Sequence, residues 1–243
     1  MEIDGKTYEV LRKQGPSGME IDGVELKWLG HSGFEIIVKN GVERRIFIDP
    51  YNLSPSVTDK ADILLITHSH YDHCSIKDIE KITRPGMVVV CPADVQSKIT
   101  KITEVQMQVM EAGDELEING IKIEAIAAYN TNKEFHTKKD HFLGYLIKAK
   151  KAVIYHAGDA DKIPEMEKLT GYGKHENNFI VLLPVSGIYV MNADEAAEAA
   201  ALINADIAIP MHYGSGIGTA EDGKKFVDDC KQLGIHAELL EKV

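Results

Sequence analysis

Cysteine is scarce in this chain: Cys74, Cys91 and Cys230 are odd in number and widely spaced. That spacing does not make a disulfide framework, and without a CxxC pair it excludes a Cys-His zinc finger. Cys74 stands beside a histidine cluster, but a small buried residue is the expectation there, not a ligand. A reducing, cytoplasmic setting is the simplest interpretation.

Long apolar runs and an excess of positive charge are also missing. No run approaches the roughly 20 apolar residues that span a bilayer, and the first residues, MEIDGKTYEVLRKQG, contain no apolar signal core. Neither a membrane span nor export is therefore expected. The formal charge is −11, which disfavours nucleic acid as a partner because its binders usually carry a basic footprint.

The remaining composition is that of a soluble globular protein. Hydrophobic residues make up 44% of the 243 residues and charged residues 27%, so the chain has the length to bury a sizeable core. No Pro/Ser-rich linker divides it. We expect one domain over residues 1–243, with residues 1–20 as a polar N-terminal extension and the oligomeric state open.

Strand signals dominate the first half of the chain, and strands alternate with helices in the second. Asn40-Gly41 and Asn119-Gly120 are typical of hairpin turns. Strands are expected at 24–29, 34–38, 45–49, 63–67, 87–91, 116–118, 121–126, 142–148, 152–156, 180–184, 207–210 and 236–240, and helices at 76–82, 93–99, 163–169, 193–203 and 220–233. This order favours two packed sheets with helices outside.

The densest chemistry lies in residues 63–75, ILLITHSHYDHCS, where an apolar run leads into His68, His70, Asp72 and His73. Buried, each of these side chains would need its own polar partner, and a metal ion supplies that partner for all of them at once. His68 and His70 are two residues apart, so they point the same way on an extended segment. The cluster predicts a metal site that needs further ligands.

Three residues are candidates to complete it. Asp159, in YHAGDAD, and His212, in IPMHYG, each follow an apolar strand, as the cluster itself does; His136 is the third candidate. Metal-type residues thus recur at the C-terminal ends of three strands, which indicates a two-metal site with shared ligands. For Asp159 alone, a helix N-cap is the structural alternative.

THSHYDH matches the HxHxDH signature of the metallo-β-lactamase superfamily, and the later GD and strand-end histidine match its downstream motifs in the same order. The segments WLGHSGFEI, IDPY, YNTNKEFH, YHAGDAD, LPVSGIYVM and IPMHYG resemble its branch of metal-dependent hydrolases. That branch is similar to the ascorbate-6-phosphate lactonase and N-acyl-phosphatidylethanolamine phospholipase D type enzymes. The resemblance runs from about Val24 to the C-terminus.

The resemblance implies an α+β fold, an αββα four-layer sandwich with the metals at one edge between the sheets. It implies one ion held by His68, His70 and His136, a second held by Asp72, His73 and His212, and Asp159 bridging both. A hydroxide between the two divalent ions would be the nucleophile, and Asp72 would orient it and exchange its proton. Zinc is the first expectation for the metal, with manganese or iron as alternatives.

The third histidine has a competitor. His136 fits the family's placement, but His156 lies three residues before Asp159. We place His156 in the pocket as a hydrogen-bond donor or general acid, with a buried structural role as its alternative. His31 and Asp49 are expected to orient ligands or line the pocket; a buried hydrogen-bonded pair is the alternative.

On the substrate side, Tyr51, Tyr129 and Tyr189 are candidates for the pocket wall. Lys133 and Lys138 flank His136 and are expected to attract an anionic substrate; a solvated loop is the alternative. The sequence thus predicts a metal-dependent hydrolase that cleaves an ester, lactone or phosphoester bond of a small, anionic molecule.

Two other functions are compatible with the site. A nuclease or RNA-processing enzyme is one, although the acidic charge counts against it. A non-hydrolytic metal-binding or redox protein is the other, since flavodiiron-type relatives use a similar site, but they need a flavin domain for which this chain lacks the length.

Overall fold

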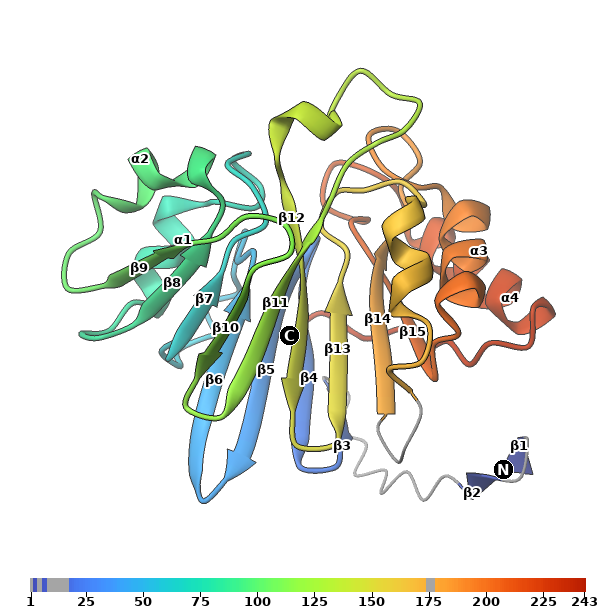
Figure 1. The fold of residues 1–243 in the computed structure, drawn as a ribbon, viewed down its shortest axis with the longest axis horizontal. Helices are drawn as coiled ribbons and strands as arrows, with labels where there is room; N and C mark the ends of the chain where they lie inside the picture. The colour runs from blue at the N-terminus through green and yellow to red at the C-terminus, as the bar shows by residue number, and fades with distance from the viewer. Residues whose placement is uncertain (1, 4–5, 8–17, 174–177) are drawn as a thin grey trace.

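A computed structural model of the protein describes residues 2–3, 6–7, 18–173 and 178–243, and two large β-sheets form its centre (Figure 1). The seven-stranded sheet contains, in spatial order, β3 (Met19–Ile21), β4 (Val24–Gly30), β5 (Gly33–Asn40), β6 (Val42–Ile48), β7 (Ile63–Leu65), β8 (Val88–Cys91) and β9 (Gln106–Val109). The six-stranded sheet contains β10 (Glu115–Ile118), β11 (Ile121–Ala127), β12 (Leu143–Ala149), β13 (Ala152–His156), β14 (Asn178–Pro184) and β15 (Ile207–Met211).

Helices cover the outer face of each sheet (Figure 1). The seven-stranded sheet carries α1 (Ile76–Ile82), η1 (Ala93–Val95) and α2 (Gln96–Ile99), and the six-stranded sheet carries η3 (Pro164–Leu169), α3 (Ala193–Ile203) and α4 (Ala220–Gln232). One hydrophobic cluster fills the space between the sheets and continues beneath α3 and α4; a second packs α1 and α2 against the other sheet. The expected αββα sandwich is therefore confirmed.

The N-terminal extension expected at residues 1–20 lies mostly outside the described residues. Its described parts include a small strand pair, β1 (Glu2–Ile3) with β2 (Lys6–Thr7). Met19 and Glu20 belong instead to β3, because Met19 pairs with Leu26 and is only 8% exposed. The seven-stranded sheet thus begins inside the segment that we expected to be an extension.

Local sequence accounts for several of these elements. At the β10–β11 turn, Asn119 and Gly120 have φ of 53° and 79°, the left-handed conformation at both positions that suits the twist of a tight hairpin. Helix α3 begins at a capping box in which Asn192 accepts from the backbone N–H of Glu195 and the Glu195 side chain accepts from that of Asn192. Its small alanines then pack closely against the core.

Three expected elements differ in form. The expected helix at 93–99 is a 3-10 turn followed by a four-residue α-helix, and the one at 163–169 is the 3-10 helix η3. The strand expected at 236–240 is wrong: this segment makes one isolated bridge, Ala208 to Ala237, beside β15. A single bridge leaves most of its backbone groups outside the sheet ladder. No helix in the described ranges is long and apolar enough to cross a membrane.

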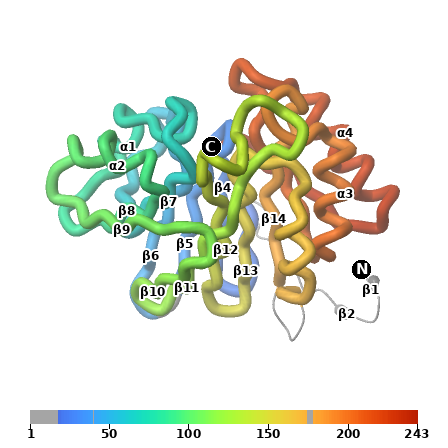
Figure 2. Tube along the Cα trace, turned by 45° about the horizontal axis from the view of Figure 1, so that its top comes forward, coloured from blue at the N-terminus to red at the C-terminus, as the bar shows by residue number. Residues whose placement is uncertain are grey.

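The two sheets meet so that several strands end at one edge. Strands β6 to β9 are parallel to one another, and so are β13 to β15. The β4–β5 turn and the β11–β12 loop reach the same edge, because Phe34 pairs with Ile48 and Leu143 with Ala127. Figure 2 brings this edge forward, and the β11–β12 loop, which contains η2 (Lys138–Asp140), arches over it. Every segment nominated for chemistry ends here.

Gly144 in β12 allows the backbone after β13 to approach β12 closely at this edge. A Cβ there would lie 2.6 Å from the carbonyl oxygen of His156 and 2.9 Å from that of Ala157, both of them backbone atoms. We therefore expect Gly144→Ala to lower the free energy of unfolding by about 1–3 kcal/mol, measured by urea denaturation. The exposed Lys122→Ala on β11 is the control, with a change within about 0.5 kcal/mol. Equal stability of the two variants would contradict this account.

Candidate metal centre

Asp159, in the loop after β13, lies at the centre of the nominated residues. Its Oδ2 is 3.1 Å from Nε2 of His212, 3.5 Å from that of His136 and 3.9 Å from that of His68. Its Oδ1 is 3.3 Å from Nε2 of His73. Helix η3 starts only at Pro164, so the carboxylate does not serve as its N-cap. One buried carboxylate thus faces four imidazoles that come from three separate segments.

The potential ligand atoms fall into overlapping groups. His68, His70 and His136 form one group, with Nδ1 of His70 at 3.1 Å from Nε2 of His68 and 3.2 Å from Nε2 of His136. His31, Asp72, His73 and His212 form a second, and His68, His73 and Asp159 link the two. This partition has the same members as the ligand sets that the family resemblance implies, with His31 in addition. Only His70 is exposed, so the cluster opens to solvent on its side.

Hydrogen bonds on the far side of the rings orient two of these imidazoles. Nδ1 of His73 lies 2.7 Å from Oδ2 of Asp49, which follows β6, and Nδ1 of His136 lies 3.1 Å from the carbonyl oxygen of Tyr189. Both acceptors are oxygens without a hydrogen, so each Nδ1–H donates. When the ring is neutral, its Nε2 lone pair is then directed at the cluster.

Thr67 orients a third ring by the same logic. Its hydroxyl donates its single hydrogen to Asp49, at 2.6 Å, while Nδ1 of His68 lies 3.0 Å from the same hydroxyl oxygen. His68 must therefore donate from Nδ1, which leaves its Nε2 lone pair toward Asp159. Ser186, at the end of β14, contacts Nδ1 of His212 at 3.0 Å. Thr67, Ser186 and Asn130, which bonds the Tyr189 carbonyl, were missed by sequence reasoning, although all three lie at strand ends.

The cluster has strongly coupled charges. Burial disfavours the charged ring of His73, but the carboxylates of Asp159 and Asp49 overcome this and hold its pKa well above the usual value. Burial raises the pKa of Asp159, yet the adjacent His212 and His73 lower it well below the ordinary range. Burial drives the pKa of His68 well below normal, which keeps that ring neutral. Asp72 is also buried, but the hydrogen bond from His31 lowers its pKa to about 2.

Two buried atoms at the centre fit a cation. Within the described part of the chain, Nε2 of His73 and Oδ1 of Asp159 lie 3.3 Å apart, and neither makes a hydrogen bond of good geometry although both are buried. An unpaired buried polar atom is costly, and a divalent ion would satisfy both. Imidazole nitrogens together with carboxylate oxygens suit zinc, iron or manganese better than calcium or magnesium. The donor set therefore fits the metal chemistry expected from sequence.

The backbone at this edge is unusual as well. Four residues of the site or its supports adopt the left-handed region although none is glycine: His31, Asp49, His136 and His212, with φ of 54°, 41°, 53° and 61°. Such conformations cost free energy and tend to concentrate at functional sites. At His31, Asp49 and His212, each directly after a strand, this conformation lets the chain leave the strand end sharply; His136 lies within the β11–β12 loop.

His156 does not join the cluster. It is completely buried, its Nε2 donates to the carbonyl oxygen of Ser32 at 2.8 Å, and its Nδ1 accepts from the backbone N–H of Gly158 at 3.2 Å. Both ring nitrogens are therefore engaged, and burial lowers the ring's pKa. The geometry corrects the expected general-acid role: His156 connects β13 to the β4–β5 turn of the other sheet.

The lysines expected to attract an anion are also engaged. Lys133 forms an ion pair with Asp161, and Lys138 lies 2.9 Å from Glu165 and 3.2 Å from the hydroxyl of Tyr129. The Tyr129 hydroxyl in turn donates to Glu165 at 2.8 Å. These contacts anchor the loop that carries His136. Each lysine thus already has a carboxylate partner within the protein, and substrate binding by Lys133 and Lys138 stays a prediction.

Tyr51 and Tyr189 lie nearer the cluster, and Cys74 stays apart from it. The Tyr51 ring contacts that of His31 with centroids 5.7 Å apart, while Tyr189 contributes its carbonyl to His136. Cys74 is 3% exposed and burial raises the pKa of its thiol to about 11, so it remains protonated, as suits a packing residue.

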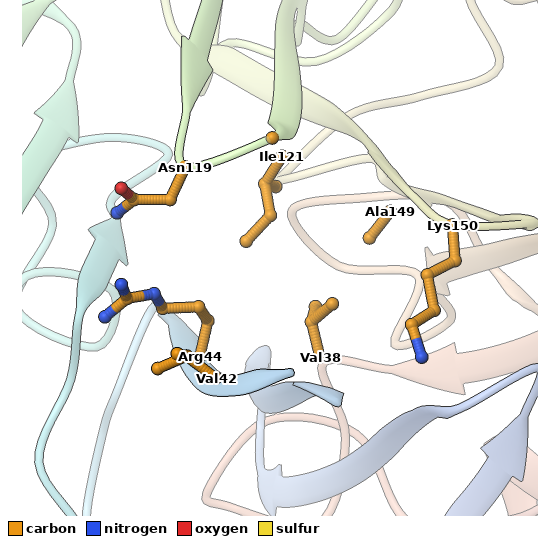
Figure 3. A pocket seen from close by; sticks show the side chains of 8 residues that line it. Val38, Val42, Arg44, Asn119, Ile121, Ala149 and Lys150 are labelled. Atoms are coloured by element: carbon orange, nitrogen blue, oxygen red, sulfur yellow. The ribbon is translucent and has the colours of Figure 1, made fainter. Parts of the chain in front are cut away.

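A separate hollow lies at the opposite end of the sandwich (Figure 3). It has a volume of about 270 Å³ and lies among the β5–β6, β10–β11 and β12–β13 turns, with Val38 and Ile121 in its wall and Arg44 and Lys150 at its sides. None of the metal-type residues lines it. The candidate metal ligands therefore lie away from this hollow.

Comparison with known proteins agrees with this geometry. A family model, the Beta-lactamase superfamily domain, matches residues 25–212. A UPF0173 metal-dependent hydrolase from Thermococcus onnurineus is 31% identical over 228 residues, covering 89% of this chain and 95% of that protein. One from Thermoplasma volcanium is 32% identical over 219 residues, covering 88% and 94%.

Solved structures show the same architecture. A protein from Parabacteroides distasonis, assigned as a metal-dependent hydrolase, is similar with a TM-score of 0.76 and 28% identity, covering 90% of this chain and 94% of that one. Igni18, a metallo hydrolase from Ignicoccus hospitalis, gives a TM-score of 0.70 at 23% identity, covering 90% and 95%. The second likeness supports the fold alone.

Asp49 offers a test of how the ligands are held. Asp49→Asn keeps the size of the side chain but weakens its bonds to His73 and Thr67, so we expect metal affinity to fall about 10- to 100-fold. Competition with a chromophoric chelator would measure it. Asp62→Asn, at a carboxylate bonded to Arg44 on the same sheet but outside the cluster, is the control. Equal metal affinities of the Asp49→Asn and Asp62→Asn variants would show that Asp49 does not support the metal ligands.

Substitution of His136 and substitution of His156 should have opposite effects on bound metal and on stability. His136→Ala should lower the bound metal, measured by elemental analysis, while changing stability little. His156→Ala should keep the metal but lower the free energy of unfolding by about 1–3 kcal/mol, because it leaves the Ser32 carbonyl and Gly158 N–H unpaired. Metal loss in the His156 variant, with full metal in the His136 variant, would reverse the assignment.

Proposed function

This chain belongs to the β-lactamase superfamily, among its UPF0173 metal-dependent hydrolases, and from that premise we propose that it cleaves an ester, lactone or phosphoester bond of a small molecule with two divalent ions. His68, His70 and His136 would hold one ion, and Asp72, His73 and His212 the other. Asp159 would bridge the two.

The observation that carries this proposal is the direction of the lone pairs. His68 and His136 each donate from Nδ1 to a fixed oxygen, so in the neutral ring the Nε2 lone pair of each faces Asp159. A packed or purely structural histidine cluster has no need for two acceptor nitrogens that face one carboxylate. Bound ions would supply a Lewis acid for the scissile bond and lower the pKa of water toward 7.

The protein's own residues position the Asp72 carboxylate and shield most of the proposed ligands from solvent. The hydrogen bond from His31 to Oδ2 of Asp72, 3.1 Å long, fixes the rotation of that carboxylate, which in this proposal orients the attacking water and takes its proton. Among the nominated ligands only His70 is exposed, so substrate would approach from its side while the other ligands stay shielded from solvent. We propose zinc first, with manganese or iron as alternatives.

Asp159→Ala tests the function directly. We expect it to lose at least one ion per chain and to lower kcat/KM by at least about 10³-fold, because both groups of ligands share this carboxylate. Elemental analysis and a panel of aryl esters, lactones and phosphodiesters would measure both effects. The exposed Glu80→Ala on α1 is the control.

Three outcomes would oppose the proposal. Full metal content in the Asp159 variant would remove the bridging role. Activity of the wild type on RNA or DNA in place of small esters would favour a nuclease. Bound redox-active iron without any hydrolysis would favour a redox protein.

A further inference from the structure

Three of the large apolar side chains that remain exposed lie beside proposed ligands or beside Tyr189, whose carbonyl oxygen contacts His136. Tyr71 stands between His70 and Asp72 and is 68% exposed; Phe135 precedes His136 and is 54% exposed; Ile188 precedes Tyr189 and is 62% exposed. We call Tyr71, Phe135 and Ile188 the apolar rim. Apolar groups exposed together around a functional centre indicate a binding surface.

The rim lies on two sides of the cluster. The Tyr71 ring contacts that of Tyr51, at 5.8 Å between centroids, and Tyr51 contacts His31 at 5.7 Å, which places Tyr71 on the side of the second ligand group. The Phe135 ring contacts that of Tyr189 at 5.0 Å, on the side of His136. An apolar substituent held at either position would lie next to the ligands.

Positive charge near the same ligands is largely used within the protein. Lys133 and Lys138 are paired with Asp161 and Glu165, and Lys98 donates to the carbonyl oxygen of Ser69, the residue between His68 and His70. The site therefore offers a candidate substrate more apolar contact than free cationic charge. Lys139, which is exposed on the His136 loop, is one residue through which an anion could still be attracted.

We propose that the substrate carries a bulky acyl or aryl group next to the bond that is cleaved, and that the apolar rim binds this group. This inference rests on the proposed function for the identity of the reacting centre. It replaces the expected preference for a small anion with a preference set by apolar contact.

The test measures binding, so that it does not depend on turnover. Isothermal titration of the zinc-loaded protein with acetate, butyrate, hexanoate and octanoate keeps the carboxylate constant and varies the chain. For the wild type we expect affinity to rise roughly two- to fourfold for each methylene that the rim covers. In the Phe135→Ala/Ile188→Ala double variant this rise should largely disappear, while acetate binds as before.

Matched controls separate the rim from general effects. Leu233→Ala removes an apolar side chain of similar exposure, 50%, beyond the end of α4, and should keep the wild-type series. Lys139→Ala should also keep it, whereas weaker binding of all four carboxylates in that variant alone would assign recognition to charge and overturn the proposal. Metal content is measured in every variant.

Other results would also overturn the inference. Affinity that does not depend on chain length, absence of binding, or an equal series in the double variant would each do so. So would a wild-type dimer in sedimentation that the double variant loses, because the rim would then be an interface between copies. A metal-free wild type would instead defeat the proposed function, and the series repeated on that protein would still report on the rim.

Discussion

The buried carboxylate of Asp159 is the constraint on which the site depends. A buried charge of this kind is strongly unfavourable without a partner, and Nε2 of His68 and of His136 cannot donate to it while their neutral rings donate from Nδ1. A divalent cation would reconcile the carboxylate with these lone pairs. This explains why Asp49, Thr67 and Tyr189 hold the outer sides of the rings: those bonds determine which nitrogen faces inward.

The same edge also holds the two sheets together. The backbone N–H of Leu143 donates to the carbonyl oxygen of Thr67 at 3.0 Å, and that of His212 donates to the carbonyl oxygen of His31 at 2.9 Å. His156 and Tyr145 add side-chain bonds from the six-stranded sheet to the seven-stranded one, at Ser32 and Ile66. Backbone groups at the strand ends thereby bond to one another across the sandwich, and the candidate ligands of opposite sheets come close together.

The sequence indicated the site best where ligands are close in the chain or follow apolar strands. The spacing of His68, His70, Asp72 and His73 was informative by itself, and Asp159 and His212 stood out because each follows a buried strand. His136 depended on family resemblance, since its loop has no regular pattern. Spacing alone did not separate His136 from its competitor: His156 lies three residues from Asp159, but the strand directs its ring toward the opposite sheet.

What the sequence by itself determined is the order of strands and helices, two packed sheets with helices outside, the turn at Asn119-Gly120 and the chemical type of the site, because these follow from local periodicity and residue chemistry. Only the tertiary structure decided which carboxylates pair with Lys133 and Lys138 and which group bonds to each histidine Nδ1. It also decided that Phe135 and Ile188 are exposed. Each of these depends on contacts between segments far apart in the chain. Charge pairing and burial are properties of such contacts, and no local pattern of residues encodes them.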